Sequence, residues 1–240
     1  MLISFDFWGT LYNHSGTKES RMAVVHNLIN NYFLQNNIPY NNNVNDIFTI
    51  TDKYIKHCHS QNTFPSDEII GEYISKQYDF IFDKYFFIEL KKQIENLYIN
   101  TIKPIPIKGV REFLRNATRN HKLCITSDTF FIRGKTIRKI LQMDGLLECF
   151  DSFFFSDEMG YNKTNHTGLI TLIKQDNYNK KDVVHIGDSL GSDRIYAMNL
   201  RVQFIHYLSD LGSISPHKYF FNSYSELDSI LNSITHDSTD

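Results

Sequence analysis

Hydrophobic residues follow two different patterns along the chain. Between residues 17 and 100 they recur every three or four positions, which is typical of amphipathic helices. One such helix face comprises Met22, Val25, Leu28, Ile29, Tyr32 and Phe33. Two acidic residues, Asp67 and Glu68, follow Pro65-Ser66 and indicate the first turn of another helix. The pattern predicts a bundle of four helices in this part of the chain, joined by polar segments such as 41–43.

The remaining residues alternate between short apolar runs and helical stretches. The predicted strands are 2–7, 123–126, 152–155, 183–186, 202–207 and 219–221, and the predicted helices are 110–120, 134–143, 167–175, 192–199 and 225–234. This alternation predicts a parallel sheet with helices on both faces. We therefore expect an α/β protein with a doubly wound parallel sheet and an inserted helical bundle. Residues 1–14 and 105–240 would form the α/β core, and residues 15–104 the inserted domain.

Charge and cysteine content narrow the class of protein. The chain has 240 residues, with 25 Lys and Arg against 27 Asp and Glu, so no basic surface for nucleic acid or anionic membranes is indicated. No apolar run approaches the roughly 18 residues that span a bilayer. Its three cysteines, at positions 58, 124 and 149, are far apart, which excludes a disulfide framework and fits a reducing compartment. We expect a cytoplasmic protein, and the pattern carries no signal of an oligomeric state.

Polar side chains follow four of the predicted strands. These segments are residues 6–11, 127–129, 156–163 and 187–193. Because ligands bind beyond the carboxyl ends of parallel strands, we expect Asp6, Asp188 and Asp193 to converge there. Three adjacent carboxylates repel one another, and a hard cation such as Mg²⁺ relieves that repulsion. Ser127 and Lys163 add a hydroxyl donor and a positive charge, which suit an anion such as phosphate, and Asp6 is placed to attack phosphorus.

These segments resemble, in order, the four motifs of the haloacid dehalogenase (HAD) superfamily. The matching pieces are Asp6-x-x-Gly-Thr10-Leu, Ile125-Thr126-Ser127-Asp128, Ser156-Asp157-Glu158 through Lys163, and Gly187-Asp188-x4-Asp193. Each motif alone is weak, but their order behind predicted strands is specific, and the resemblance covers nearly the whole chain. The helical insertion looks like a C1-type cap, which in the family closes over the active site and selects substrates.

The resemblance implies a role for each matched position. Asp6 would be the nucleophile, and Asp193 would support either Lys163 or the water shell of a magnesium ion. The implied Mg²⁺ ligands are Asp6, Asp188 and the backbone carbonyl of Trp8. The implied substrate-binding residues are Trp8, Gly9, Thr10, Ser127, Asp128 and Lys163, of which Ser127 and Lys163 would hold the phosphoryl oxygens. The implied reaction is hydrolysis of a small phosphorylated, or otherwise anionic, metabolite.

One position departs from the family pattern. Phosphatases of this family carry a second aspartate two residues after the nucleophile, as general acid and base, and here that position is Trp8. Such help is worth about 10²–10⁴ in rate, so another group, such as His14, Asp128, His57 or His59, would have to supply it. Two alternatives therefore stay open beside the phosphatase. One is a weak or inactive phosphate-binding module. The other is a metal-independent 2-haloacid dehalogenase, since those enzymes carry a bulky tyrosine at this position, although they generally lack the Gly187-Asp188 pair.

Overall fold

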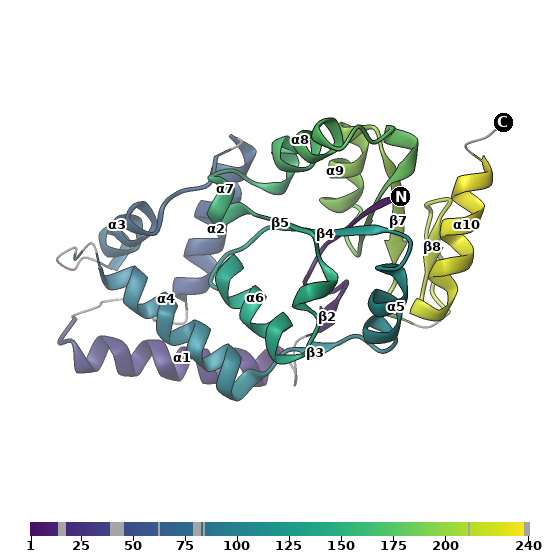
Figure 1. Cartoon of the computed structure of the whole chain (residues 1–240). Helices are drawn as coiled ribbons and strands as arrows, with labels where there is room; N and C mark the ends of the chain where they lie inside the picture. The colour runs from purple at the N-terminus through teal and green to yellow at the C-terminus, as the bar shows by residue number, and fades with distance from the viewer. Residues whose placement is uncertain are drawn as a thin grey trace.

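The protein consists of a parallel sheet flanked by helices and a group of four further helices to one side (Figure 1). The computed structural model describes residues 1–13, 18–38, 46–61, 63–78, 83, 85–210 and 212–237. His14 and the expected polar joint at 41–43 lie outside these residues. Among the helices of this described part, none is long and apolar enough to cross a bilayer.

The sheet has six strands, all parallel, in the order β5-β4-β1-β6-β7-β8. The strands are β1 (Leu2–Phe5), β4 (Lys122–Ser127), β5 (Ser152–Phe155), β6 (Val183–Gly187), β7 (Gln203–Tyr207) and β8 (Phe220–Phe221). Phe5 of β1 is level with Ile125 of β4 and Ile186 of β6. The residues that follow these three central strands therefore emerge at the same edge of the sheet.

Helices cover both faces of the sheet, as the sequence predicts. The flanking helices are α5 (Val110–Ala117), α6 (Gly134–Met143), α7 (Ser156–Met159), α8 (Thr167–Gln175), α9 (Asp193–Leu200) and α10 (Leu227–Asp237). Strand β1 illustrates the arrangement, because successive side chains of a strand point to opposite faces. Ile3 and Phe5 belong to the larger core with α5, α6 and α10, whereas Leu2 packs in the smaller core with α8 and α9. The doubly wound α/β class is thus confirmed.

Most element bounds agree with the predicted ranges, and the differences have local causes. β1 ends at Phe5 rather than at residue 7, because Phe7 already takes part in a tight turn in which its carbonyl accepts from the amides of Leu11 and Tyr12 (3.0 Å each). The first flanking helix ends at Ala117 rather than at residue 120. A two-stranded antiparallel ribbon of β2 (Tyr12–Asn13) and β3 (Ile105–Pro106) was not predicted. It brings the two ends of the helical segment side by side.

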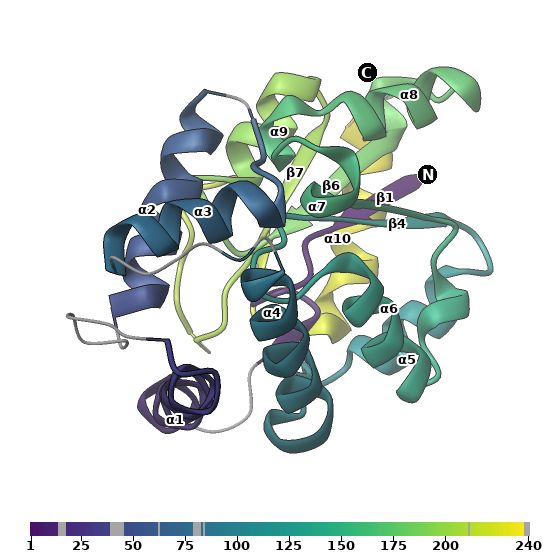
Figure 2. The same ribbon diagram turned by 90° about the vertical axis from the view of Figure 1, so that its left-hand side faces the viewer.

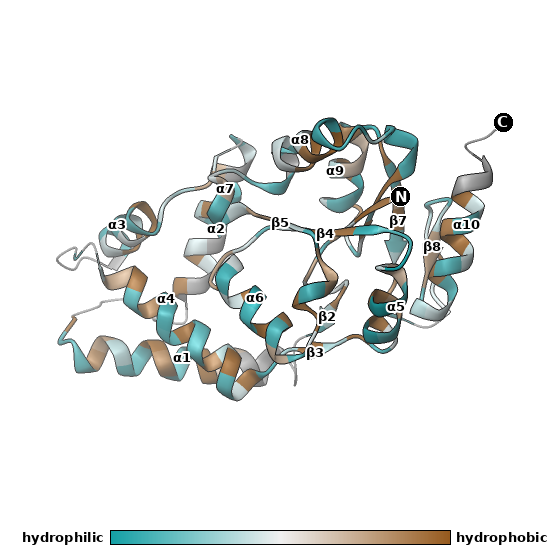
Figure 3. Ribbon diagram, in the orientation of Figure 1, coloured by the Kyte–Doolittle hydropathy of each residue, from teal (hydrophilic) through white to brown (hydrophobic). Residues whose placement is uncertain are grey.

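Four helices lie between β2 and β3, and they gather on one side of the molecule (Figure 2). They are α1 (Lys18–Gln35), α2 (Asp46–Ser60), α3 (Asp67–Tyr78) and α4 (Phe86–Leu97), and a π-helical turn (Tyr98–Ile102) follows α4. Hydrophobic and hydrophilic positions alternate in bands along α1 and α4 (Figure 3). Aromatic pairs join the helices: Phe33 of α1 contacts Phe86 of α4, and Tyr54 of α2 stacks on Tyr73 of α3 (4.0 Å between ring centroids).

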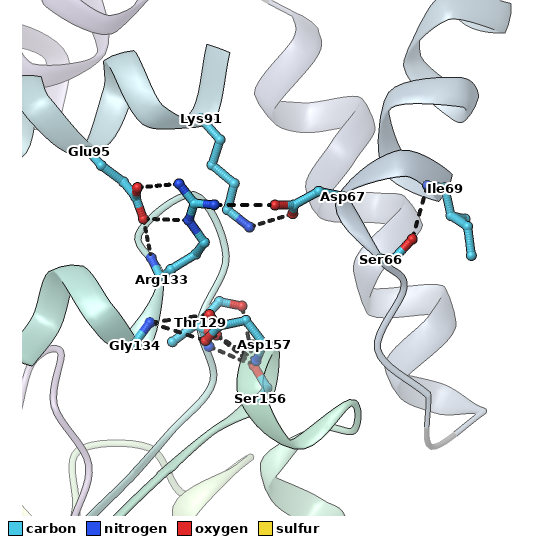
Figure 4. Close-up of polar contacts among 10 residues, drawn as sticks. All are labelled: Ser66, Asp67, Ile69, Lys91, Glu95, Thr129, Arg133, Gly134, Ser156 and Asp157. Atoms are coloured by element: carbon cyan, nitrogen blue, oxygen red, sulfur yellow. Dashed lines mark hydrogen bonds and ion pairs between the residues drawn. The ribbon is translucent and has the colours of Figure 1, made fainter. Parts of the chain in front are cut away.

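An ion-pair network ties α3 and α4 to the loop after β4 (Figure 4). Glu95 of α4 accepts three hydrogen bonds from Arg133, one from its amide (2.9 Å) and two from its guanidinium (2.9 and 2.5 Å). Asp67 of α3 lies 3.7 Å from the same guanidinium and 2.7 Å from the ammonium of Lys91, whose side chain is 1% exposed. Nearby, the ring of Phe87 in α4 packs against that of Phe131 in the loop after β4 (5.8 Å between centroids). The contact therefore combines charge pairing with apolar packing.

We expect Glu95→Gln to lower the free energy of unfolding at pH 7 by about 1.5–3 kcal/mol, because hydrogen bonds between charged groups are lost at a buried position. Glu89→Gln, which removes an exposed pair with Lys92 on the same helix, is the matched control and should cost less than about 1 kcal/mol. Denaturant titration of the three proteins measures both differences.

The same variant should show a defined pH dependence. Burial favours the neutral carboxyl of Glu95, but hydrogen bonds and charge from Arg133 outweigh it, so the pKa is lowered below its usual value of 4.5. A lowered pKa stabilises the fold above the unfolded-state value and loses that contribution as pH falls through the folded-state value. The difference between wild type and Glu95→Gln should be full at pH 7 and shrink below about pH 4.5. A difference that stays constant down to pH 3 would contradict the pairing.

Candidate active site

Three carboxylates and one lysine meet at the carboxyl edge of the sheet. Asp6 follows β1, and Asp188 and Asp193 follow β6, the neighbouring strand. One oxygen of each carboxylate lies within 4.8 Å of the others. The Lys163 ammonium, carried by the loop after α7, lies 2.7 Å from Asp6 Oδ1 and 2.6 Å from Asp193 Oδ1. The structure thus brings together the four charged residues that the sequence predicts to lie at one site.

Burial and mutual charge set the pKa values in this cluster. Burial raises the pKa of Asp6 to about 7, because the attraction of Lys163 is partly cancelled by the repulsion of Asp193. Burial also disfavours an ionised Asp193, but Lys163 and a hydrogen bond from His185 outweigh it and hold the pKa of Asp193 below its usual range. For Lys163 burial opposes the charge, yet Asp193 and Asp6 raise its pKa well above the ordinary value. The ion pair of Lys163 and Asp193 is therefore the fixed charge pair of the cluster.

The donor set fits a hard divalent cation. Three carboxylates face a single ammonium, so negative charge is in excess when all are ionised. Asp188 is exposed, so a cation can approach it from solvent. Protein packed around its carboxyl group and the charge of Asp193 raise its pKa, and a bound cation would favour the ionised form. Carboxylate oxygens with room for retained waters are the environment that Mg²⁺ prefers. Asp6 and Asp188 are the carboxylates available to it, because Asp193 is already fully engaged.

Glycine at two positions permits the close approach of these groups. Gly9 has φ +76°, and a β-carbon there would lie 2.4 Å from Asp188 Oδ2. A β-carbon on Gly187 would lie 2.1 Å from Cγ of Asp193. Any side chain at either position would push a carboxylate out of the cluster, which explains the need for glycine in both segments.

A buried hydrogen-bond chain supports Asp193 from beneath. His185 Nε2 lies 2.9 Å from Asp193 Oδ1, and because the ionised carboxylate only accepts, Nε2 carries the proton. His185 Nδ1 then accepts from Ser4 Oγ (3.0 Å), which in turn accepts from Thr126 Oγ1 (3.0 Å). Burial lowers the pKa of His185, which keeps the ring neutral and suits this single arrangement. Together with the Ser189 amide at 3.0 Å, the chain fixes the orientation of Asp193 toward Lys163.

The loop after β4 carries the remaining expected residues. Ser127 is buried and lines the same small pocket as Lys163. Asp128 Oδ1 accepts from the backbone amide of Lys163 at 2.6 Å, so its carboxylate holds the lysine loop in place. Further along, Thr129 hydrogen-bonds to Ser156 and Asp157 after β5 (Figure 4). These bonds fix the distance between the second and third polar segments.

Comparison with known families decides the identity of this arrangement. A model of the haloacid dehalogenase-like hydrolases matches residues 1–194. The chain belongs to this family. Its members are hydrolases, and the six-stranded parallel sheet described above is the fold of this HAD-like hydrolase. A search of curated proteins finds no match.

Solved structures share the fold along nearly their whole length. One is the HAD-hydrolase candidate YfnB from Bacillus subtilis, solved with bound magnesium (19% identity, TM-score 0.64, covering 96% of this chain and 98% of that one). Another is a 2-haloacid dehalogenase from Pseudomonas syringae pv. Tomato DC3000 (13%, 0.68, 97% and 98%). A third, from Haemophilus somnus 129PT, is described as a predicted phosphoglycolate phosphatase (16%, 0.61, 95% and 96%). At these identities the likeness extends to the fold.

In this HAD-like hydrolase, Trp8 stands at the boundary between the sheet and the four helices. Its indole contacts the ring of Phe7 (4.8 Å between centroids) and that of Tyr98 in the π-helical turn (6.1 Å). The side chain is half-buried. At the position where family phosphatases carry a second aspartate, this chain thus has an aromatic side chain that contacts the helical insertion.

The groups considered as replacements for that aspartate differ in their surroundings. His57 is exposed on α2 and hydrogen-bonds to Gln61. His14 and the side chain of His59 lie outside the described residues. Asp128 is close to the cluster, but one of its oxygens is engaged by the Lys163 amide. Thr10, an expected substrate-binding residue and not one of these candidates, is fully buried, and its hydroxyl has no hydrogen-bond partner among the described residues.

Sequence reasoning missed the supporting residues rather than the charged ones. His185 is one of these supporting residues, and the polar Ser4 in an otherwise apolar strand is the signal in the sequence that points to a buried polar group below the site. Glu95 and Arg133 carried no such signal, because their pairing follows from how the insertion packs on the core.

Proposed function

We propose that this HAD-like hydrolase is a Mg²⁺-dependent phosphatase that acts on a small phosphorylated metabolite through an aspartyl-phosphate on Asp6. The observation that carries the proposal is the Asp6 carboxylate, held by the ammonium of Lys163 beside Asp188 at the open edge of the sheet. A nucleophile, a cationic group and a cation site within a few ångström are what phosphoryl transfer requires.

The proposed reaction has two steps. An Asp6 carboxylate oxygen attacks phosphorus, the bond from phosphorus to the ester oxygen breaks, and that oxygen takes a proton from solvent to leave as the alcohol. A water oxygen then attacks the phosphorus of the aspartyl-phosphate and loses a proton to solvent. The bond from phosphorus to the Asp6 oxygen breaks, which releases inorganic phosphate and restores Asp6. Lys163 favours ionised Asp6 and neutralises charge on the phosphoryl oxygens, while Ser127 donates a hydrogen bond to them. Bound by Asp6, Asp188 and the Trp8 carbonyl, Mg²⁺ would supply further neutralisation of the phosphoryl group.

The domain boundaries also belong to the proposal. Residues 1–14 and 105–240 would form the catalytic core, and residues 15–104 a C1-type cap that selects the substrate. The β2–β3 ribbon at the two ends of this segment and the contact of Tyr98 with Trp8 support a cap beside the site. The near-neutral charge and dispersed cysteines support a cytoplasmic enzyme whose partner is a small anion rather than nucleic acid or a membrane.

Mutation of the two carboxylates tests the mechanism. Asp6→Asn should reduce phosphate release from a panel of phosphate esters by roughly 10³-fold or more, because the nucleophile is lost. Asp188→Asn should raise the Mg²⁺ concentration needed for half-maximal rate. Asp151→Asn, at the opposite edge of the sheet, is the control and should leave the rate unchanged. Full activity in both site variants would refute the mechanism.

A second candidate, a phosphate-binding module with little turnover, is favoured by Trp8. If the missing general acid limits the rate, Trp8→Asp should raise kcat by about 10-fold or more, within the 10²–10⁴ that such groups provide. Trp8→Asn is the control, because asparagine is similar in size to aspartate but cannot transfer a proton. Circular dichroism checks that both variants fold. Equal rates in the two folded variants would show that an acid at this position is not limiting.

The dehalogenase alternative has a separate signature. A metal-independent dehalogenase would release halide from 2-haloacids in the presence of a chelator, whereas the proposed phosphatase should release none and should lose its phosphatase activity when Mg²⁺ is removed. Halide release with the chelator present would favour the dehalogenase.

A further inference from the structure

We propose that two residues of the C-terminal part of the chain, His206 and Tyr224, are positioning residues that hold the two loops carrying the site. Both lie beyond residue 194, where the match to the family model ends. Each donates a hydrogen bond to a backbone carbonyl of one loop. His206 holds the loop that begins with Asp188, and Tyr224 holds the turn that contains Thr10.

His206 lies in β7, beside the end of β6, and is buried. Its Nε2 lies 3.0 Å from the carbonyl oxygen of Asp188. A carbonyl only accepts, so Nε2 must carry a proton, and an imidazole that carries a single proton there has Nδ1 as an acceptor. Ser215 Oγ lies 2.7 Å from Nδ1 and donates to it, and the same oxygen accepts from the His217 amide at 3.0 Å.

This chain of bonds fixes both the ring and its tautomer. The amide of His217 orients the Ser215 hydroxyl, the hydroxyl selects the proton position on His206, and His206 thereby presents a donor to Asp188. This bond matters because Asp188 is the most exposed carboxylate of the cluster. Since its side chain reaches solvent, the direction of that side chain depends on its backbone, which His206 of β7 holds. His206 therefore orients the backbone of Asp188 so that its carboxylate points toward the proposed cation site.

Tyr224 performs the corresponding task for the first loop. Its hydroxyl donates to the carbonyl oxygen of Thr10 at 2.6 Å, and the residue is 2% exposed. The ring packs against those of Phe113 (5.7 Å between centroids) and Phe221 (5.2 Å). Gly109 lets the chain approach closely, because a β-carbon there would lie 2.9 Å from the β-carbon of Tyr224. A rigid ring thus delivers one donor to the turn that follows Asp6.

The hydrogen bonds from His206 and Tyr224 hold the two loops that meet where Gly9 approaches Asp188. Gly9, next to Thr10 in the first turn, approaches Asp188 so closely that no β-carbon fits between them. A small displacement of either loop therefore changes the separation of Asp6 and Asp188. On the proposed function, this separation decides whether the two carboxylates bind one cation, so His206 and Tyr224 act on the site without touching substrate.

The test compares His206→Ala, His206→Gln and Tyr224→Phe with Tyr32→Phe as the matched control. Tyr32 is a buried tyrosine of α1 whose hydroxyl donates to the carbonyl oxygen of Phe86 in α4 (3.5 Å), so its loss removes the same kind of group away from both loops. Hydrogen exchange of the intact protein should speed up in residues 188–193 for His206→Ala and in residues 7–12 for Tyr224→Phe. Tyr32→Phe should change neither loop.

Two further measurements separate positioning from general loss of stability. By calorimetry, His206→Ala should weaken Mg²⁺ binding about 10-fold, as is typical for residues that orient metal ligands, and His206→Gln, which can keep a donor near Nε2, should restore part of it. With p-nitrophenyl phosphate as the probe, Tyr224→Phe should lower kcat several-fold while KM stays within about twofold.

Failure of this inference is distinguishable from failure of the proposed function. Exchange unchanged in both loops, or changed equally by all variants including Tyr32→Phe, would overturn the positioning roles even if the wild type hydrolyses esters. Loop-specific exchange in a wild type and variants that release no phosphate would leave the positioning roles standing and refute the phosphatase.

Discussion

The ammonium group of Lys163 lies between two buried carboxylates, and the rest of the site depends on this arrangement. Removing an isolated charge from water costs several kcal/mol, so neither Asp6 nor Asp193 would stay ionised in this position without a partner. Lys163 serves both, but one positive charge cannot neutralise two negative ones and Asp188 as well. The fold resolves part of this with hydrogen bonds from His185 and Ser189 to Asp193. The remaining negative charge lies at the solvent side, where a cation can approach.

The topology explains why these residues can meet at all. β1 and β6 are neighbours at the centre of the sheet, so the residues that follow them emerge side by side. Asp6 comes from the first residues of the chain and Asp188 from its last quarter, with the four-helix insertion between them in sequence. Because the insertion leaves and rejoins the core at one short ribbon, β2 with β3, it does not disturb the sheet.

The sequence was sufficient for the sheet and for the charged residues of the site. The predicted helices at 134–143 and 167–175 and the strand at 152–155 agree residue for residue with the structure, since their hydrophobic periodicity is unbroken. The convergence of Asp6, Lys163 and Asp188 followed from a general rule about parallel sheets. The supporting contacts did not follow, because their partners are far apart in sequence: His185 and Ser4 are 181 residues apart, and Tyr224 and Thr10 are 214 apart. No periodic pattern specifies such pairs.

Trp8 marks where this protein departs from a family phosphatase. The indole stands where family phosphatases have a carboxyl group, and it packs against Tyr98 of the insertion, so this position links the loop after β1 to the four helices. Glu95 with Arg133 provides a second link between the two parts.

The most direct measurement of the central claim is anomalous diffraction from crystals grown with Mn²⁺ in place of Mg²⁺. A single anomalous peak in contact with carboxylate oxygens of both Asp6 and Asp188, with Lys163 still paired to Asp193, is the expected result. Occupied Mn²⁺ sites elsewhere with no peak between these two carboxylates would contradict the account.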